Sequence, residues 1–384
     1  MVQKAFLSRL KLTDFRNYPE AVLMLDGRHV VLTGDNGAGK TNLLEAVSFL
    51  SPGRGLRRAV LSEVSRVGGT GGFSVFAEVE GMEGEVSLGT GIDGDSDSLS
   101  RRLRINGTPA RSTEELSDHL SVLWLTPAMD GLFTGPSADR RRFLDRLVLS
   151  IDPGHGRRAS DFERAMRSRN RLLSEGRYDP AWVSAVEAQM AGLGISMAAA
   201  RREMLDLLRH LASVSQQEPF PTPVLALEGF LDAAGDMPAA ELEERYLDML
   251  REGRGRDAAA GRTLEGPHRS DLLVRHREKD MDAGRCSTGE QKALLIGLIL
   301  AHARLTANMT GFAPVLLLDE IAAHLDEGRR IALFDLVHEL GGQAFMTGTD
   351  DAMFSPLGER AQFLEVDGGS IRRGPLLSTR LQDC

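Results

Sequence analysis

The chain has 384 residues and a formal net charge of −9 at pH 7. This length allows two domains, or one domain with a large insertion, and the acidic balance excludes a surface that is cationic throughout, although local basic clusters could still bind DNA. Cys286 and Cys384 are too far apart in sequence to indicate a disulfide framework or a metal site, which suits a reducing cytosol. Neither a signal-peptide core nor an apolar run of about 18 residues is visible, so we expect no targeting segment and no membrane span.

The first elements precede a glycine-rich segment. Residues 6–12 alternate and predict a strand with Phe6, Leu10 and Leu12 on one face, and residues 21–25 predict a second short strand. Between them, Arg16 and Asn17 could lie beside an adenine, with Arg16 stacking or hydrogen-bonding. The same residues also suit an ordinary polar turn.

The stretch 34–41 reads G-D-N-G-A-G-K-T and fits the phosphate-loop pattern G-x-x-x-x-G-K-[ST]. A β-branched run, 29–33, precedes it, and a helical pattern, 42–50, follows, which makes a Gly-rich turn that binds nothing a poor alternative. Backbone N–H groups and the helix N-terminus would face phosphate oxygens, Lys40 would reach the β- and γ-phosphates, and Thr41 would hold Mg²⁺. The expected nucleotide contacts are Gly34, Asp35, Asn36, Gly37, Ala38, Gly39, Lys40 and Thr41. The expected core positions of the helix are Leu43, Ala46, Val47 and Leu50.

Residues 68–107 predict an antiparallel sheet. Its expected strands are 73–80, 85–88 and 101–105, the last followed by the turn Asn106-Gly107. Three acids imitate the start of a calcium loop: Asp93, Asp95 and Asp97. The sixth position is Ser98 instead of Gly and the twelfth is Arg104 instead of Glu, so we interpret the segment as a solvated hairpin tip.

Beyond residue 127 the pattern becomes helical, with expected helices at 137–149, 159–173, 181–212 and 238–251 and one strand signal at 224–227. The first two helices are rich in arginine, with Arg140, Arg141, Arg142, Arg164, Arg167, Arg169 and Arg171. These side chains could contact DNA phosphates, or they could form a solvated helical face. The Gly-Arg-rich stretch 253–261 predicts a mobile connector.

Two further motifs follow. Ser287 is placed as the N-cap of a helix, with Glu290 three residues on completing a capping box. Four apolar residues, 315–318, then run into Asp319 and Glu320, the pattern of a buried strand that ends in a metal site. Asp319 would help to place Mg²⁺ and Glu320 would polarise the attacking water as general base.

The ordered set of phosphate loop, S-x-G-x-Q, hydrophobic-D-E and L-D resembles that of ABC-type ATPases, and within them the chromosome-maintenance (SMC-like) branch. The resemblance is closest to the RecF family of recombination mediators, through the blocks 12–18, 34–42, 126–145, 266–272 and 287–291. The fold it implies is an α/β ABC-ATPase head with a parallel or mixed sheet and an antiparallel β arm, plus a helical lobe inserted between the phosphate loop and the signature. The corresponding domains are an ATP-binding core, 1–126 and 264–384, and a lobe, 127–263, that contacts DNA or a partner.

The resemblance also implies function. ATP and Mg²⁺ would join two subunits head to tail, so that Ser287 of one meets the γ-phosphate held by Lys40 of the other, with Gln291 and Asp326 also near the nucleotide. A weak, DNA-stimulated ATPase would bind gapped or single-stranded DNA and duplex in the cytoplasm, help RecO and RecR to load RecA, and support the SOS response. Since no His follows the strand near 346, Thr347 or Thr349 is the expected stand-in for the γ-phosphate sensor, and no Gln stands out at the junction of the arm and the helical region.

Other function classes remain at this point. One is a transporter-type or other SMC-like ABC ATPase subunit; the arginine-rich insertion and the blocks 15–18 and 266–271 argue against a transport subunit, and the insertion is too short for a long coiled coil. Another is a structural interaction module, which would keep Lys40 but tolerate loss of Glu320. The presence of Glu320 favours a cycle of hydrolysis.

Overall fold

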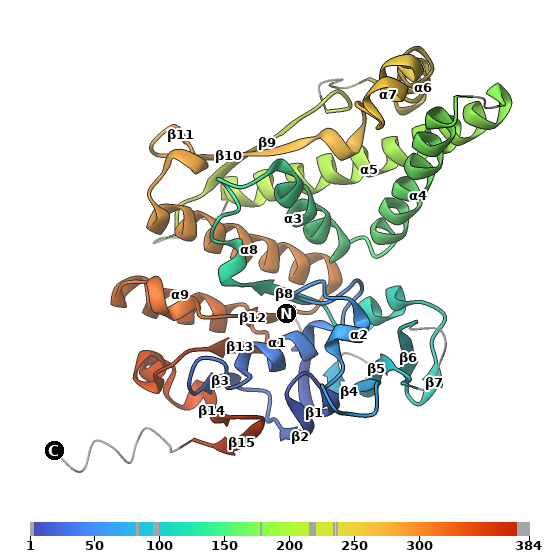
Figure 1. Ribbon diagram of the computed structural model, residues 1–384. Coiled ribbons are helices and arrows are strands. Elements are labelled where there is room, and N and C mark those ends of the chain that lie inside the picture. Colours follow the sequence, from blue (N-terminus) through green and yellow to red (C-terminus); the bar gives the residue numbers. More distant parts are fainter. Residues whose placement is uncertain are drawn as a thin grey trace, which may run out of the picture. The chain divides into compact units, whose positions relative to one another are not determined.

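The computed structural model describes residues 4–81, 84–94, 100–176, 179–214, 220–232, 235 and 237–374. The chain divides into two compact units, and each is described by itself. The first comprises residues 1–130, 218–220 and 295–384, and the second comprises 131–217 and 221–294 (Figure 1).

The first unit contains a mixed six-stranded sheet with the order β15-β14-β3-β13-β12-β8. Its strands are β3 (His29–Thr33), β8 (Val122–Leu125), β12 (Val315–Leu318), β13 (Ala344–Thr347), β14 (Ala361–Asp367) and β15 (Ser370–Arg373). All neighbours pair in parallel except β15, which pairs antiparallel with β14 at the edge. The apolar runs at β3 and β12 are buried, as a parallel sheet covered on both faces requires.

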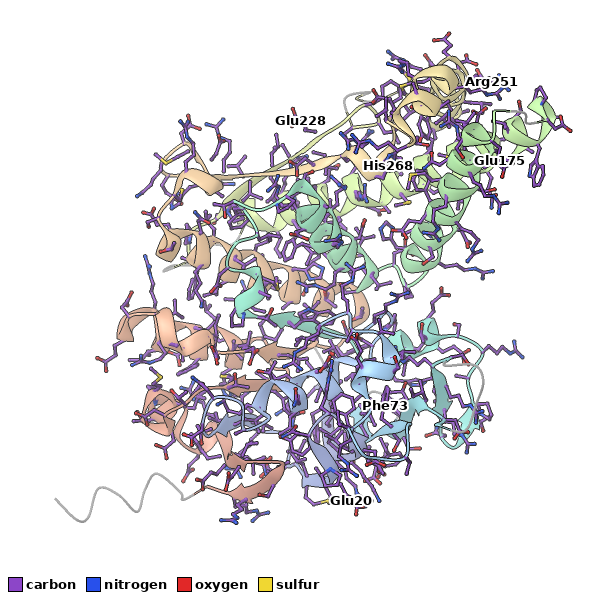
Figure 2. All side chains as sticks on the ribbon, viewed as in Figure 1. Glu20, Phe73, Glu175, Glu228, Arg251 and His268 are labelled. Carbon is purple, nitrogen blue, oxygen red and sulfur yellow. The ribbon has the colours of Figure 1, made fainter. Side chains whose placement is uncertain are left out.

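An antiparallel sheet forms the arm, with the order β2-β1-β4-β5-β6-β7. Its strands are β1 (Phe6–Phe15), β2 (Tyr18–Met24), β4 (Phe73–Gly81), β5 (Gly84–Ile92), β6 (Arg102–Ile105) and β7 (Thr108–Pro109). The Asn106-Gly107 turn joins β6 to β7 with both residues at positive φ, as predicted. Phe73 points into the core and Glu20 lies on the outer side (Figure 2). Of the imitation calcium loop, Asp93 pairs with Arg102, whereas Asp95, Asp97 and Ser98 lie outside the described residues.

The prediction that Phe6 shares a face of its strand with Leu10 and Leu12 is wrong. The pairing of β1 with β4 shifts register between Leu7 and Arg9, so Leu7 is fully buried while Phe6 is only partly covered. Leu10 and Leu12, beyond the shift, are buried as predicted. An extra residue at a bulge moves every side chain before it to the opposite face, which simple alternation along the sequence does not reveal.

The two sheets of this unit enclose α1 (Lys40–Ser48), which contacts β1 of the arm and β8 and β13 of the mixed sheet. Leu43, Ala46, Val47 and Leu50 are buried in this core, as predicted. A buried glutamine joins the sheets directly: Gln343 Oε1 accepts from Leu7 N at 3.0 Å, and its Nε2 donates to Leu7 O at 3.3 Å and to Arg28 O at 3.2 Å. Two further α-helices of the unit are α2 (Leu61–Val64) and α9 (Glu327–Glu339).

The second unit is mainly helical. Its helices are α3 (Ser137–Leu149), α4 (His155–Ser174), α5 (Pro180–Val214), α6 (Ala239–Glu252) and α7 (Arg254–Ala260), with a small antiparallel sheet of β9 (Pro223–Glu228), β10 (Asp271–His276) and β11 (Met281–Asp282). An apolar cluster that includes Phe162, Met190 and Tyr246 binds α4, α5 and α6 together. Arg251 and Glu175 project outward from this unit (Figure 2).

The prediction of a mobile connector at 253–261 is wrong, because Arg254–Ala260 form α7. Asp257 of this helix is buried, accepts from Arg169 at 2.6 Å, and also accepts from Leu264 N at 3.1 Å. Gly261 then ends the helix in the left-handed conformation. The second unit also extends past the expected lobe 127–263, because β10 pairs along its whole length with β9.

Helix α8 (Thr288–Thr310) begins in the second unit and continues in the first. Within the described residues, α5 and α8 are both long and apolar enough to cross a membrane by length and composition. Of their most apolar windows, 50% and 72% respectively are buried inside the protein. We therefore interpret both as core helices.

Candidate nucleotide site

The phosphate loop connects the carboxyl end of β3 to the N-terminus of α1. Two of its glycines have positive φ in crowded surroundings: a Cβ on Gly34 would lie 2.1 Å from Val366 O, and one on Gly39 would lie 2.6 Å from the Tyr18 hydroxyl. Only glycine fits these two positions. The first turn of α1 carries no acidic side chain and no side-chain cap, so its N–H groups and positive dipole end favour an anion.

Three side chains that precede or follow the loop hold its backbone. Tyr18 donates its hydroxyl to Gly39 O at 3.0 Å, and Asn17 Nδ2 donates to Ala38 O at 3.1 Å. Asn42 Nδ2 in turn donates to Asn17 Oδ1 at 2.7 Å. Burial raises the pKa of Tyr18, so this phenol stays protonated as a donor. The sequence placed Asn17 beside an adenine and did not predict that Asn17, Tyr18 and Asn42 hold the backbone of the loop. The one signal for Tyr18 and Asn42 is position, next to the Arg16-Asn17 turn and to Thr41.

Lys40 bends over the loop. Its ammonium donates to Gly34 O at 2.5 Å and to Asp35 O at 2.9 Å. Burial lowers the pKa of Lys40, while the nearby charges of Glu320, Asp319 and Asp35 act to raise it. The lysine is therefore positioned between the loop and the acids that follow β12.

Three side chains and one backbone N–H meet where α1 begins and the parallel strands β12 and β13 end. Thr41 Oγ1 donates to Asp319 Oδ1 and Oδ2 at 3.0 and 3.1 Å. Thr347, at the end of β13, donates its hydroxyl to Asp319 Oδ1 at 2.8 Å and accepts from the backbone N–H of Glu320 at 2.8 Å. Glu320 has a left-handed backbone (φ 50°), an uncommon conformation for a residue other than glycine. Of the two expected threonines, Thr347 is the one in contact with the acids.

This arrangement suits Mg²⁺. In the described residues, no group of three or more His, Cys, Asp or Glu side chains could hold a metal by itself. Magnesium needs no such group, because it is usually held by one or two protein oxygens together with substrate phosphates and water. The facing hydroxyl of Thr41 and carboxylate of Asp319 supply that pair of oxygens. The residues present therefore fit the ion.

Arg16 is less available than the sequence suggested. Its guanidinium makes two hydrogen bonds to the fully buried carboxylate of Glu45, at 2.8 and 2.7 Å, and a third to Glu63 O at 2.7 Å. Arg57 donates to the same carboxylate at 2.8 Å. Three of the five N–H donors of Arg16 are engaged in these bonds. Its face and one N–H on each terminal nitrogen are left for the expected contact with an adenine.

Ser287 and Glu290 form the predicted capping box. Glu290 Oε2 accepts from Ser287 N at 3.0 Å, and Ser287 Oγ accepts from Glu290 N at 3.4 Å. Gln291 is buried and donates to Cys286 O at 2.8 Å, so its amide supports this turn. Asp326 caps α9 by accepting from Arg329 N at 2.9 Å.

Most arginines of the helical lobe have internal partners. Arg169 is fully buried and bonds to Glu187, Asp257, Thr263 and Leu250 O. Arg140 makes a two-point contact with Asp271, and Arg141 donates to Ser270 O. The more exposed ones pair within one helical turn with acids: Arg142, Arg164, Arg167 and Arg171. The exposed group matches a solvated helical face, and the buried group is structural.

The comparisons with known proteins cover almost the whole chain. Residues 6–369 match the family model described as the RecF/RecN/SMC N terminal domain. "DNA replication and repair protein RecF" of Agrobacterium fabrum is 73% identical over 97% of this chain and 99% of its own length. The protein of the same name from Rhizobium meliloti is 73% identical over 97% of this chain and 100% of its own.

Solved structures agree in fold. One, described as the recombination mediator protein RecF-ATPrS in the RecFOR pathway, has a TM-score of 0.83 at 22% identity and covers 97% of this chain and 98% of its own. The Smc head domain from Pyrococcus furiosus has a TM-score of 0.54 at 16% identity, covering 98% of each chain. The ABC-ATPase head with an antiparallel arm and helical elements, expected from the sequence, is thereby confirmed, and the chain belongs to the RecF family.

Proposed function

We propose that this protein is an ATP-switched, DNA-binding clamp that acts in recombinational repair of single-strand gaps. The observation that carries the proposal is the contact of the Asp319 carboxylate with Thr41 and Thr347, together with the bond from the Glu320 backbone N–H to Thr347. Phosphoryl transfer requires mainly positioning and neutralisation of charge, and these groups together with Lys40 supply both. The repair role rests on the names of relatives that are 73% identical over nearly their full length.

In this proposal the loop N–H groups and Lys40 bind the phosphates, and Thr41 and Asp319 hold Mg²⁺, which would neutralise charge on them. Glu320 accepts a proton from the attacking water as general base. Thr347 fixes both acids, because its hydroxyl bonds to the Asp319 carboxylate and to the Glu320 backbone. Gln291 acts as a positioning residue for Ser287, since its amide is committed to its own turn.

The finer parts of the proposal concern assembly. ATP would join two copies head to tail, with Ser287 of one copy facing the γ-phosphate bound by the other. The clamp would bind duplex next to a single-stranded gap in the cytoplasm, and RecO and RecR would be its partners in loading RecA. The capping box fixes Ser287 at the N-terminus of the long helix α8. Its two bonds already engage the N–H groups of Ser287 and Glu290, so the γ-phosphate would be met by the Ser287 hydroxyl and by the N–H groups between these two residues. Hydrolysis, weak and stimulated by DNA, would release the clamp, and repair of this kind would support the SOS response.

The test is the molar mass of the Glu320→Gln protein by light scattering, with ATP and with ADP, each with and without a gapped duplex. We expect a dimer with ATP alone, more populated with the gapped duplex, because the variant binds ATP but cannot hydrolyse it. Lys40→Met is the matched control and should remain monomeric and bind no nucleotide. A Glu320→Gln protein that hydrolyses ATP at the parental rate contradicts the assignment of the base, and a monomer under every condition contradicts the shared site.

A further inference from the structure

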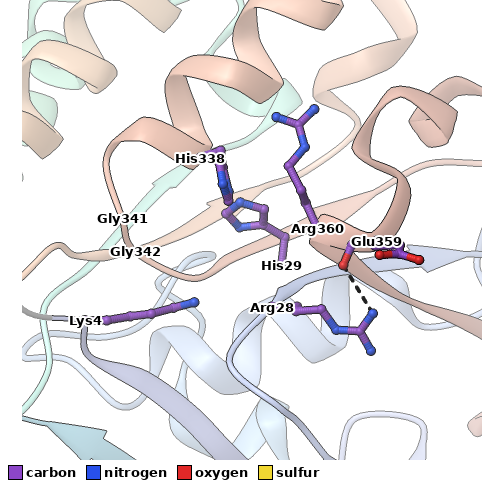
Figure 3. Close-up of a pocket in the computed structure, with 8 residues that line it drawn as sticks. All are labelled: Lys4, Arg28, His29, His338, Gly341, Gly342, Glu359 and Arg360. Atoms are coloured by element: carbon purple, nitrogen blue, oxygen red, sulfur yellow. Dashed lines mark hydrogen bonds between the residues drawn. The ribbon is translucent and has the colours of Figure 1, made fainter.

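A cavity lies in the first unit, away from the phosphate loop. It has a volume of about 340 Å³ and is lined by Lys4, Arg28, His29, His338, Gly341, Gly342, Glu359 and Arg360 (Figure 3). His29 and Ala344 stand at the amino ends of β3 and β13, whereas the phosphate loop and Thr347 stand at the carboxyl ends of the same strands. A five-residue strand separates the two ends by about 15 Å, so the cavity is distinct from the nucleotide site.

His29 is the unusual member of this lining. Its side chain is buried (3% exposed), and its Nδ1 accepts from the backbone N–H of Ala344 at 3.2 Å. A neutral imidazole that accepts at Nδ1 carries its proton on Nε2. That Nε2–H donor is buried and has no hydrogen-bond partner in the protein. A buried donor without an acceptor is unfavourable, so an acceptor from outside the chain would stabilise this position.

The charges around His29 favour an anion as that acceptor. Burial, first, and then the neighbouring His338, Lys4 and Arg360 lower the pKa of His29 to about 4, so its ring is neutral at pH 7 and lies near the positive charges of Lys4 and Arg360. Lys4 points its ammonium toward His29, whereas the Arg360 side chain lies beside His338 with its guanidinium directed away from His29 (Figure 3).

The two arginines of the lining already have acidic partners, which limits their contribution. Arg28 is bonded to Asp26 and turns toward the backbone of Glu359, and Arg360 is bonded to Asp335. In the part of the chain that the structure describes, Lys4 pairs with no carboxylate and lies 5.8 Å over the ring of Phe6. Lys4 is therefore the cation most available to a ligand.

We propose that this cavity binds a phosphate group of a small molecule, with the Nε2–H of His29 and the ammonium of Lys4 as its donors. The phosphate could be free inorganic phosphate or the terminal phosphate of a nucleoside monophosphate; both present the same oxygens, and the cavity is large enough for either. The depth of His29 favours a small anion, because a DNA backbone held at the surface does not reach a side chain that is 3% exposed.

The experiment measures binding of inorganic phosphate and, separately, of AMP to the full chain carrying Lys40→Met, which removes the lysine of the phosphate loop. Two substitutions are added to this background: Lys4→Gln, at an exposed position that leaves the fold intact, and His29→Leu. Lys11→Gln is the control for the loss of a lysine charge, since Lys11 lies seven residues further along, on β1, and pairs with Glu20 outside the cavity. Histidine side-chain NMR follows the Nε2–H of His29 during each titration.

We expect one phosphate to bind, the His29 Nε2–H signal to shift, and Lys4→Gln to weaken binding about tenfold, as the loss of one charged contact does. His29→Leu should abolish binding, and Lys11→Gln should leave it unchanged. Tighter binding of AMP identifies a nucleotide as the ligand, and equal or tighter binding of phosphate identifies the free ion. The proposal is overturned if millimolar phosphate and AMP leave the His29 signal unmoved, or if Lys4→Gln and Lys11→Gln bind alike. Because the nucleotide site is disabled in every sample, neither result depends on the proposed clamp.

Discussion

Thr347→Val tests whether one hydroxyl fixes both acids of the nucleotide site. Valine keeps the shape of threonine, but it removes the donor to Asp319 Oδ1 and the acceptor of Glu320 N, each at 2.8 Å. Thr347 is fully buried, so water does not replace either bond easily. A hydrogen bond to a charged group contributes about 1.5–3 kcal/mol, and an orphaned buried N–H costs about 1–3 kcal/mol.

These terms overlap, because Asp319 keeps its contact with Thr41 and the backbone of Glu320 can relax. We therefore expect the first unit to lose about 2–4 kcal/mol of unfolding free energy. If about 2 kcal/mol of this lost free energy also stabilised the transition state, the rate of ATP hydrolysis falls about 30-fold. Nucleotide affinity should change little, since the phosphate loop and Lys40 are untouched.

The assay is single-turnover ATP hydrolysis, paired with nucleotide binding and with denaturant unfolding of the same protein. Thr349→Val is the matched control, because Thr349 is exposed two residues further along the same chain segment. It should retain parental hydrolysis and stability. Parental hydrolysis by Thr347→Val, or a larger loss in Thr349→Val, would refute the reasoning.

Three further outcomes are expected. Arg169→Met should lower the unfolding free energy of the second unit by about 3–5 kcal/mol in denaturant titrations, because the buried carboxylates of Glu187 and Asp257 lose their shared partner. Arg164→Met, on the exposed face of α4, should change the same quantity by less than about 0.5 kcal/mol. Gly39→Ala should abolish nucleotide binding, measured by calorimetry, because the new Cβ would collide with the side chains of Asn17 and Tyr18. Gly37→Ala should weaken binding less, because its Cβ would meet no atom within 4 Å. Burial alone would raise the pKa of Asp145, but the bonds from His155 and Arg201 outweigh burial and hold this pKa at about 2, below the unfolded value of about 3.9. The ionised carboxylate therefore contributes its full stabilisation above about pH 4 and loses it as the pH falls toward 2. In denaturant titrations, the difference in unfolding free energy between the parent and Asp145→Asn should become smaller over that range.

The parts of the site that the sequence predicted are those with a local cause. The phosphate loop needs its glycines and Lys40 within a few residues, and four apolar residues before Asp319 predict a buried strand by themselves. The contact between Asp319 and Thr347 depends instead on β12 and β13 lying side by side, and residues 28 apart carry no local signal of that pairing. For this reason the sequence alone did not show which of Thr347 and Thr349 lies beside Asp319.

The two wrong predictions have the same origin. Residues 253–261 have the composition of a connector, but Arg169, 88 residues earlier, binds the buried Asp257 and makes a helix favourable there. Phe6 alternates correctly with Leu10 and Leu12, but the register shift against β4 turns it away from the core. In both cases a partner distant in sequence decides the local structure, which the propensities of the local residues do not predict.

The pairing of β3 has a consequence for the order of events during synthesis. The strand that carries the phosphate loop is made within the first 33 residues, yet its two neighbours are β13, which begins at Ala344, and β14, which begins at Ala361. The glutamine that joins the two sheets, Gln343, is likewise 336 residues away from Leu7. A nascent chain therefore carries the complete loop sequence for most of its translation without the strands that give the loop its shape. The ability to hold a nucleotide arises late, so a ribosome that stalls before residue 344 releases a product that contains the motif but lacks the site.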